Sequence, residues 1–119
     1  MEKILEDTLL FDFYGELLTE NQKRVYEDSV LNDLSLSEIA DDMNISRQGV
    51  RDTLVKAKTS LASYEKKLGL VTKFTEIQES VGRISGLSDR ILEDPENTES
   101  IILNINTIKD LTKYISDKL

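Results

Sequence analysis

The segment that decides the fold is SLSEIADDMNISRQGVRDTLVKAKTSLASYEKK, residues 35–67. It holds two helix starts close together: Ser35 and Glu38 have the spacing of a capping box, and Ser46 is a suitable N-cap. Between them stands Asn44, a residue that tolerates the left-handed conformation in which many helices end. The spacing therefore predicts a short helix through Met43, a tight turn, and a long helix from Ser46 to about residue 67.

The apolar residues of this segment fit two helices that cross closely. Ala40 is small where a large side chain would clash, and Ile45 is expected to fill the junction. Val50, Leu54 and Ala57 form one stripe that would face the core. Together these positions predict a helix-turn-helix of the DNA-binding kind, and the alternative is an ordinary helical hairpin in a small bundle.

Two more helices are predicted before this unit. Apolar residues recur at helical spacing over residues 3–14, and this helix should end near Gly15. Thr19 and Gln22 repeat the capping-box spacing and start a second helix that ends around residues 32–33. The residues expected to face the core are Leu5, Leu9, Leu10 and Phe13 in the first helix, and Val25, Tyr26 and Val30 in the second.

The C-terminal part, residues 69–119, has the pattern of two long helices. We interpret the break between them as a helix start, with Asp94 as cap and Pro95 at the first position. Gly82 and Gly86, one turn apart, would allow a close helix crossing. The predicted apolar stripes are Leu70, Phe74, Ile77, Val81, Ile84 and Ile91, then Ile101, Ile105, Ile108, Leu111, Ile115 and Leu119.

We therefore divide the chain into a helix-turn-helix domain, residues 1–68, and a helical tail, residues 69–119. The apolar stripes of the tail are too long for four short helices to cover, so the tail should pack on the first part or on a second subunit. We favour a homodimer, with a closed monomeric bundle as the alternative.

Composition agrees with an all-α fold and limits the function. Glycine (5) and proline (1) are few among 119 residues, and no alternating apolar run bounded by turn residues predicts a strand. The chain has no cysteine and no histidine, so the usual zinc ligands, thiolate nucleophiles and imidazole bases are missing. No apolar run reaches the roughly 20 residues that cross a bilayer, and the N-terminus does not read as a secretion signal. We expect a cytoplasmic protein that does not enter membranes.

Charge is unevenly distributed along the chain, whose net charge is −8. Residues 1–45 hold 3 basic and 12 acidic residues (−9), residues 46–67 hold 6 and 2 (+4), and residues 68–119 hold 6 and 9 (−3). Phosphate contacts need lysine and arginine. The one basic segment of an acidic chain is therefore the long helix after the predicted turn.

Several motifs resemble known proteins. LTENQKRVYE (residues 18–27) and LSLSEIADDMNISRQGVRDTLVKAKTSL (residues 34–61) resemble region 4 of bacterial sigma factors. End to end, the chain resembles the YlxM-like family of helix-turn-helix proteins, in its FDFYGELLT start, in SLSEIA, in ISRQGVRD and in the KLGL junction before a helical tail. It departs from that pattern at Asp28-Ser29, where bulky apolar or aromatic residues are more typical, and at Asn44, where glycine is commoner.

The resemblance implies a DNA-binding regulatory protein with a sigma-region-4-like helix-turn-helix. It also implies a link to the signal recognition particle pathway, because genes of the family neighbour those of the particle's GTPase. A component of that particle or RNA polymerase is then a candidate partner besides DNA. The alternative is an accessory factor that contacts protein or RNA and does not read DNA.

The long helix carries the candidate DNA contacts. Gln48 and Arg51 are placed to reach base edges, because glutamine suits adenine and arginine suits guanine. Arg47, Lys56 and Lys58 would meet phosphates. Ser46 would hold the helix start, where backbone amides also bind phosphate.

The alternative for these cations is a solvent-exposed helix face without a binding role, with ion pairs such as Arg47–Asp52 or Lys58–Glu65. Asp52 weakens the DNA interpretation, because its carboxylate repels phosphates. The local charge permits about five or six phosphate contacts, so binding by one copy should be weak and strongly dependent on salt.

No pattern predicts an enzyme, a cofactor or a metal site. The adjacent carboxylates of Asp41 and Asp42 point about 100° apart on a helix and cannot easily share a metal. The same holds for Glu93 and Asp94. Glycine-rich phosphate loops and nucleophile elbows are missing from the sequence.

Overall fold

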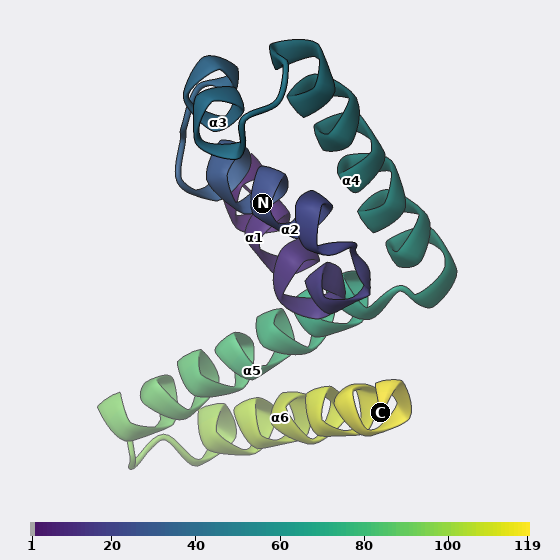
Figure 1. Ribbon diagram of the computed structural model, residues 1–119. Coiled ribbons are helices and arrows are strands. Elements are labelled where there is room, and N and C mark those ends of the chain that lie inside the picture. The colour runs from purple at the N-terminus through teal and green to yellow at the C-terminus, as the bar shows by residue number, and fades with distance from the viewer. Residues whose placement is uncertain (1) are drawn as a thin grey trace. The chain divides into compact units, whose positions relative to one another are not determined.

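The computed structural model describes residues 2–119, and the fold is all-α, as predicted. The elements are α1 (Lys3–Tyr14), a 3-10 turn (Gly15–Leu17), α2 (Glu20–Tyr26), a π-helical turn (Glu27–Leu31), α3 (Leu36–Met43), α4 (Arg47–Leu68), α5 (Leu70–Glu93) and α6 (Thr98–Lys118). The chain forms two compact units, which we call the head, up to Val71, and the hairpin, from Thr72 to Leu119. In Figure 1, α1–α4 gather in the head, while α5 and α6 run side by side.

The helix starts follow the predicted capping chemistry. Thr19 and Ser35 each form a complete capping box, with Gln22 and Glu38 as their partners. Each box satisfies two backbone amides that a helix start would otherwise leave unpaired. The Ser46 hydroxyl accepts from the Gly49 amide at 2.9 Å and starts α4. The sequence prediction of these three caps is confirmed.

The turn between α3 and α4 is built on Asn44, which adopts the left-handed conformation (φ 55°, ψ 45°). The amide of Ile45 donates to the carbonyl of Ala40 at 3.1 Å, which is the long-range bond of a Schellman ending. The Ile45 side chain does not fill the junction as we predicted: 43% of it is exposed. Its structural contribution is the backbone bond, because the turn points its side chain outward.

Two clusters of buried side chains hold the head together. Val50 of α4 packs with residues of α2 and α3, and Ala57 and Leu61 pack with residues of α1, α2 and the start of α5. Leu54 is half-buried between the two clusters. In α1 the buried side chain is Tyr14, whereas Leu5 and Phe13, which we expected to face the core, are 49% and 39% exposed. The clusters are Val25, Ile39, Ala40 and Val50, and Tyr14, Leu18, Tyr26, Ala57, Leu61 and Val71.

The second helix changes pitch after Tyr26. The Asn32 amide donates to the Glu27 carbonyl at 2.9 Å, five residues back, which defines a π-turn. The extra residue lets both Val30 and Leu31 pack against the core cluster. This turn spans the Asp28-Ser29 departure, where the sequence offers no bulky side chain.

The end of α4 is tied to α1 by hydrogen bonds. The Tyr14 hydroxyl donates to Glu65 Oε1 at 2.6 Å and accepts from the Leu70 amide at 3.0 Å. Glu65 Oε1 also accepts from the Val71 amide at 2.9 Å. Glu65 therefore caps the start of α5, while Gly69 provides the left-handed residue (φ 64°) that ends α4.

The register of the hairpin differs from the predicted stripes. Its inward residues follow a heptad in which Ser80 and Asn104 are buried, at 6% and 8% exposure, while Val81 and Ile105 are exposed. Leu70, Phe74 and Leu119, also assigned to the stripes, are exposed as well. Both the predicted and the observed stripes keep a spacing of three and four residues, and the opposite helix decides between them. The inward positions are 77, 80, 84, 87 and 91 against 101, 104, 108, 111 and 115.

Two other expectations for this part are wrong. Asp94 and Pro95 do not start a helix; they lie in the turn, and Asn97 caps α6 by accepting from the Ser100 amide at 3.1 Å. A capping residue needs its side chain beside the third amide of the helix, and Asn97 meets that condition. Gly82 and Gly86 face open space, so no close helix crossing forms there.

No helix within residues 2–119 is both long and apolar enough to cross a bilayer.

Candidate nucleic-acid interface

The predicted contact residues lie at the first three turns of α4, directly after the Asn44 turn. Ser46, Arg47, Gln48 and Arg51 are all exposed, as are the two lysines further along the helix. The buried residues Val50 and Ala57 anchor the opposite side of α4 to the core. The packing of the head therefore fixes which side of the helix a partner can reach.

Three of the predicted residues come together at one place. Arg47, Gln48 and Arg51 line a single surface depression at the start of α4. Two guanidinium groups thus stand beside one amide, which is a set of donors suited to acceptors on phosphates and base edges. Ser46 lies next to this depression, where its hydroxyl is already engaged by the Gly49 amide.

Asp52 is bonded to Gln48. Gln48 Nε2 donates to Asp52 Oδ1 at 2.9 Å, one helical turn apart, and both side chains are exposed. The ion pair Arg47–Asp52, which we considered as the alternative to a DNA contact, does not form. We call the surface formed by Arg47, Gln48 and Arg51 the reading surface. The Asp52 carboxylate belongs to it, because it is hydrogen-bonded to the Gln48 amide.

The cations of α4 have no acidic partner at contact distance. In the part of the chain that the structure describes, no carboxylate forms an ion pair with Arg47, Arg51, Lys56 or Lys58. The considered pair Lys58–Glu65 is missing because Glu65 accepts from Tyr14 and Val71 instead. These four charges remain available to an anionic partner.

Lys58 differs from the others in its surroundings. It lines a groove of the head together with Lys3, Glu6 and Asp7 of α1 and with Tyr26. Burial raises the pKa of the Tyr26 phenol above its ordinary value of 10.0, and the carboxylates of Asp7 and Glu6 raise it further. Lys3 pairs with Asp7 at 3.4 Å, so Glu6 is the carboxylate of this groove that is left to weaken the attraction of Lys58 for a phosphate.

Lys56 lies on the opposite flank of α4 from Arg47. Nine residues separate it from Arg47, which places the two about 180° apart around the helix axis. Gln48 lies between these directions, about 100° from Arg47. The cations therefore do not form one continuous basic strip; they border the reading surface on two sides.

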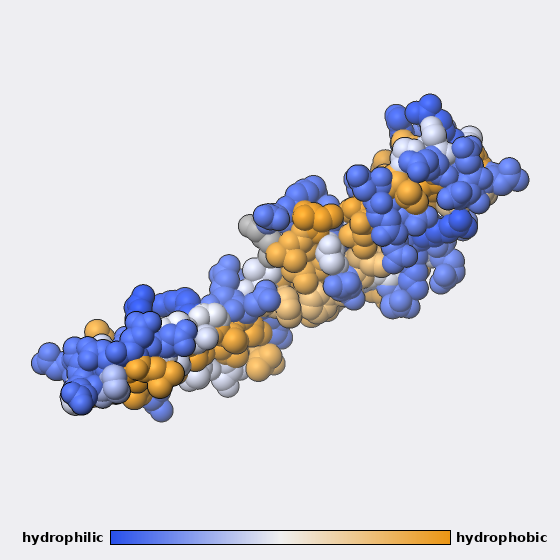
Figure 2. Space-filling model, turned by 90° about the vertical axis from the view of Figure 1, so that its left-hand side faces the viewer, coloured by the Kyte–Doolittle hydropathy of each residue, from blue (hydrophilic) through white to orange (hydrophobic). Residues whose placement is uncertain are grey.

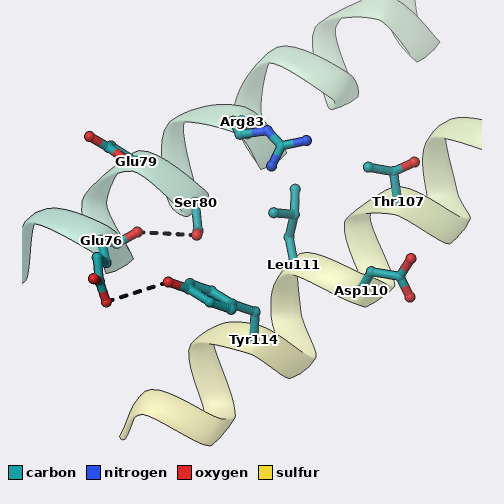
Figure 3. A pocket seen from close by; sticks show the side chains of 8 residues that line it. All are labelled: Glu76, Glu79, Ser80, Arg83, Thr107, Asp110, Leu111 and Tyr114. Carbon is teal, nitrogen blue, oxygen red and sulfur yellow. Dashed lines mark hydrogen bonds between the residues drawn. The ribbon is translucent and has the colours of Figure 1, made fainter. Parts of the chain in front are cut away.

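A second depression, which the sequence did not predict, lies between the helices of the hairpin (Figure 3). Its volume is about 400 Å³, and Arg83 reaches across it toward Leu111. The space exists because Ser80, a small residue, occupies an inward position of the heptad. The sequence did contain the signal, which is Ser80 at heptad spacing, but we assigned its more apolar neighbour Val81 to the inward position.

One edge of this depression is closed by an ion pair. Lys118 Nζ lies 2.7 Å from Glu76 Oε2, and the Tyr114 hydroxyl donates to the same oxygen at 3.4 Å. The hydrogen bond from Lys118 lowers the pKa of Glu76, and the same bond raises the pKa of Lys118. These contacts join α5 to α6, so their role is explained by the hairpin itself.

Within residues 2–119, no group of three or more acidic side chains is arranged to hold an ion. Asp41 and Asp42 are both exposed on α3.

Comparisons with known proteins agree with the motifs and the fold. The family described as "Putative helix-turn-helix protein, YlxM / p13 like" matches residues 1–104. A UPF0122 protein of Thermoanaerobacter sp. (strain X514) is 49% identical over 92 residues, which cover 75% of this chain and 79% of the relative. A UPF0122 protein of Acetivibrio thermocellus is 39% identical over 121 residues, covering 100% of this chain and 95% of the relative.

A more distant relative extends the similarity to another genus. A UPF0122 protein of Listeria monocytogenes is 36% identical over 107 residues, covering 84% of this chain and 97% of the relative. The family resemblance drawn from the sequence motifs is confirmed: the chain belongs to the YlxM/p13-like family of helix-turn-helix proteins, UPF0122.

Proposed function

We propose that this protein is a non-catalytic, DNA-binding regulator that places the start of α4 in the major groove. The observation that carries the proposal is the exposed set Arg47, Gln48 and Arg51 around one depression, directly after a helix-turn-helix turn. In such units the N-terminal part of the second helix contacts base edges. Gln48 and Arg51 would read bases, and Arg47 and the lysines would contact phosphates.

The two-sided arrangement of cations supports groove binding. A helix in the major groove runs between two phosphate backbones, so cations are useful on both of its flanks. Arg47 and Lys56 stand about 180° apart on α4, with Gln48 between them. Ser46 holds the helix start, whose dipole adds a favourable interaction with phosphate.

A second candidate function is an accessory factor that contacts protein or RNA and does not read DNA. The net charge of −8 and the acidic α1–α3 favour it, because they oppose a polyanion. The proposed link to the signal recognition particle pathway, with one of its components or RNA polymerase as partner, fits either function.

We also propose that the protein works as a homodimer. Large apolar side chains are exposed in the hairpin, and Figure 2 shows hydrophobic surface among hydrophilic side chains there. Two copies on one duplex would recover affinity that one weak head lacks. The exposed residues are Val81, Leu92, Ile102, Leu103 and Ile105. Sedimentation of the purified chain tests this, and a monomer at tens of micromolar would contradict it.

The test of DNA binding is a mobility-shift assay of the full chain on duplex fragments at several salt concentrations. Arg51→Ala and Gln48→Ala should weaken binding to a selected duplex, because both side chains lie on the reading surface. Lys67→Ala is the matched control: it removes one charge from the same helix, about 30 Å along the axis from Arg47. Unchanged binding by both test variants would make the DNA-reading assignment wrong.

A further inference from the structure

We propose that Asp52 is a positioning residue that orients the Gln48 amide to read adenine and to reject guanine in the major groove. The inference rests on the proposed function, because it concerns how the start of α4 would read a base pair. It assigns a role to the one carboxylate on the outer side of the recognition helix near its start.

The observation is the side-chain bond from Gln48 Nε2 to Asp52 Oδ1, 2.9 Å long. The two residues are four apart on α4, so their side chains lie one above the other on the same face. Both are exposed, and neither is needed by the core. The bond therefore organises the surface of the helix and leaves its packing unaffected.

The bond fixes which way the amide points. A carboxylate only accepts hydrogen bonds, so Asp52 can hold the NH₂ end of Gln48 but not its carbonyl oxygen. If the amide turned over, Gln48 Oε1 would face a carboxylate oxygen, and the two acceptors would repel each other. The carbonyl is thus directed away from Asp52, toward any base that enters the site.

The bond also limits the donors that remain. The NH₂ group has two hydrogens, and one is held by Asp52, so Gln48 presents one N–H and one carbonyl oxygen. Adenine offers the complementary pair, the N7 acceptor and the N6 donor. Guanine offers two acceptors, N7 and O6, and O6 would meet the Gln48 carbonyl. Asp52 thereby converts an adaptable amide into a selective one.

Base preference separates this role from simple charge repulsion. Asp52→Ala removes both the charge and the hydrogen bond to Gln48. Asp52→Asn also removes the charge, but its amide can donate as well as accept, so it can hold Gln48 in either orientation. If Asp52 only repels phosphates, both variants bind every duplex more tightly with the base preference of the wild type; if it positions Gln48, both also lose preference for adenine.

The experiment is a binding-site selection from a randomised duplex pool, with the full-length protein and its variants. The wild type should enrich adenine at one position, and Asp52→Asn should enrich it less. Asp52→Ala should lose at least about 5-fold of the adenine-over-guanine preference there, which corresponds to the lower limit of a bidentate base contact. In a Gln48→Ala background, Asp52→Ala should change the preference no further, and Lys67→Ala should leave it as in the wild type.

The outcomes distinguish the inference from the proposed function. If the wild type selects a site and Asp52→Ala keeps the full preference, the positioning role is overturned while DNA reading stands. If the wild type binds no duplex, the proposed function fails and the inference fails with it. Circular dichroism of each variant checks that helix content is retained.

Discussion

Replacing single cations of α4 should lower the salt dependence of DNA binding in a graded way. Each phosphate contact releases counterions, so the logarithm of the affinity falls with the logarithm of salt with a slope of about −0.9 per contact. Lys66 and Lys67 lie about 28–30 Å along the axis from Arg47, too far to share its groove. Of the four cations near the start of α4, Arg51 is assigned to a base, so the five or six phosphate contacts allowed by sequence charge are reduced to three.

The three cations assigned to phosphates should not contribute equally. Arg47 and Lys56 have no carboxylate at ion-pair distance within residues 2–119, whereas Lys58 shares its groove with acidic residues of α1. Two full contacts and one reduced one give a slope between about −1.8 and −2.7 for one head. Affinity should then fall about 12- to 40-fold between about 50 and 200 mM salt.

The assay is fluorescence anisotropy on one labelled duplex at several salt concentrations. Arg47→Ala and Lys56→Ala should each bring the slope about 0.9 closer to zero, Lys58→Ala should change it less, and Lys67→Ala should leave it unchanged. A wild-type slope of about −4 to −5 would mean that two heads bind together. The reasoning is refuted if Lys67→Ala reduces the slope as much as Arg47→Ala does, because the charges would then act without regard to position.

Further predictions concern stability. Tyr14→Phe removes the hydroxyl that donates to Glu65 and should lower the free energy of unfolding by about 1–3 kcal/mol in urea titrations; no change would mean the bond contributes nothing. Asn44→Ala should cost about 1 kcal/mol while Asn44→Gly costs little, and equal losses would contradict the role of its left-handed φ. Asn104→Leu should raise thermal stability by about 1 kcal/mol, since the buried amide has only one long bond, and a loss would show that it is better satisfied than that. Burial is the main cause that raises the pKa of Tyr14 and of Tyr26, so folding favours the neutral phenols. The resulting stabilisation is complete below pH 10.0 and should be lost as pH rises above it. Urea titrations at graded alkaline pH would follow this loss, and a constant free energy of unfolding would refute it.

The head was largely predictable because its signals are local. A capping box needs only a hydroxyl and a side-chain acceptor three residues apart, and a left-handed helix end needs only a residue that tolerates it. Both conditions are met within 12 residues, by Ser35, Ser46 and Asn44. The helices of the head therefore start and end close to where the sequence predicts.

The features that were missed depend on long-range pairing. Whether Ser80 or Val81 faces inward is set by the opposite helix, and a single-helix pattern always assigns the more apolar residue to the interior. The hydrogen bond from Tyr14 to Glu65 joins residues 51 positions apart, so no local spacing predicts it. The Gln48–Asp52 bond is local, and its i, i+4 spacing was visible in the sequence, but we weighed Asp52 only as a charge.

The acidic body of the protein has a consequence for specificity. Non-specific binding is almost entirely electrostatic and tolerates many orientations, so negative charge elsewhere on the surface removes most of those orientations. The 12 acidic residues of residues 1–45, set against 3 basic ones, would repel DNA from approaches led by α1–α3 and leave those led by the start of α4. Affinity from phosphates then stays small, and discrimination depends on base contacts such as that of Gln48. On this view, the charge that argues against strong DNA binding is what makes selective binding by a few side chains workable.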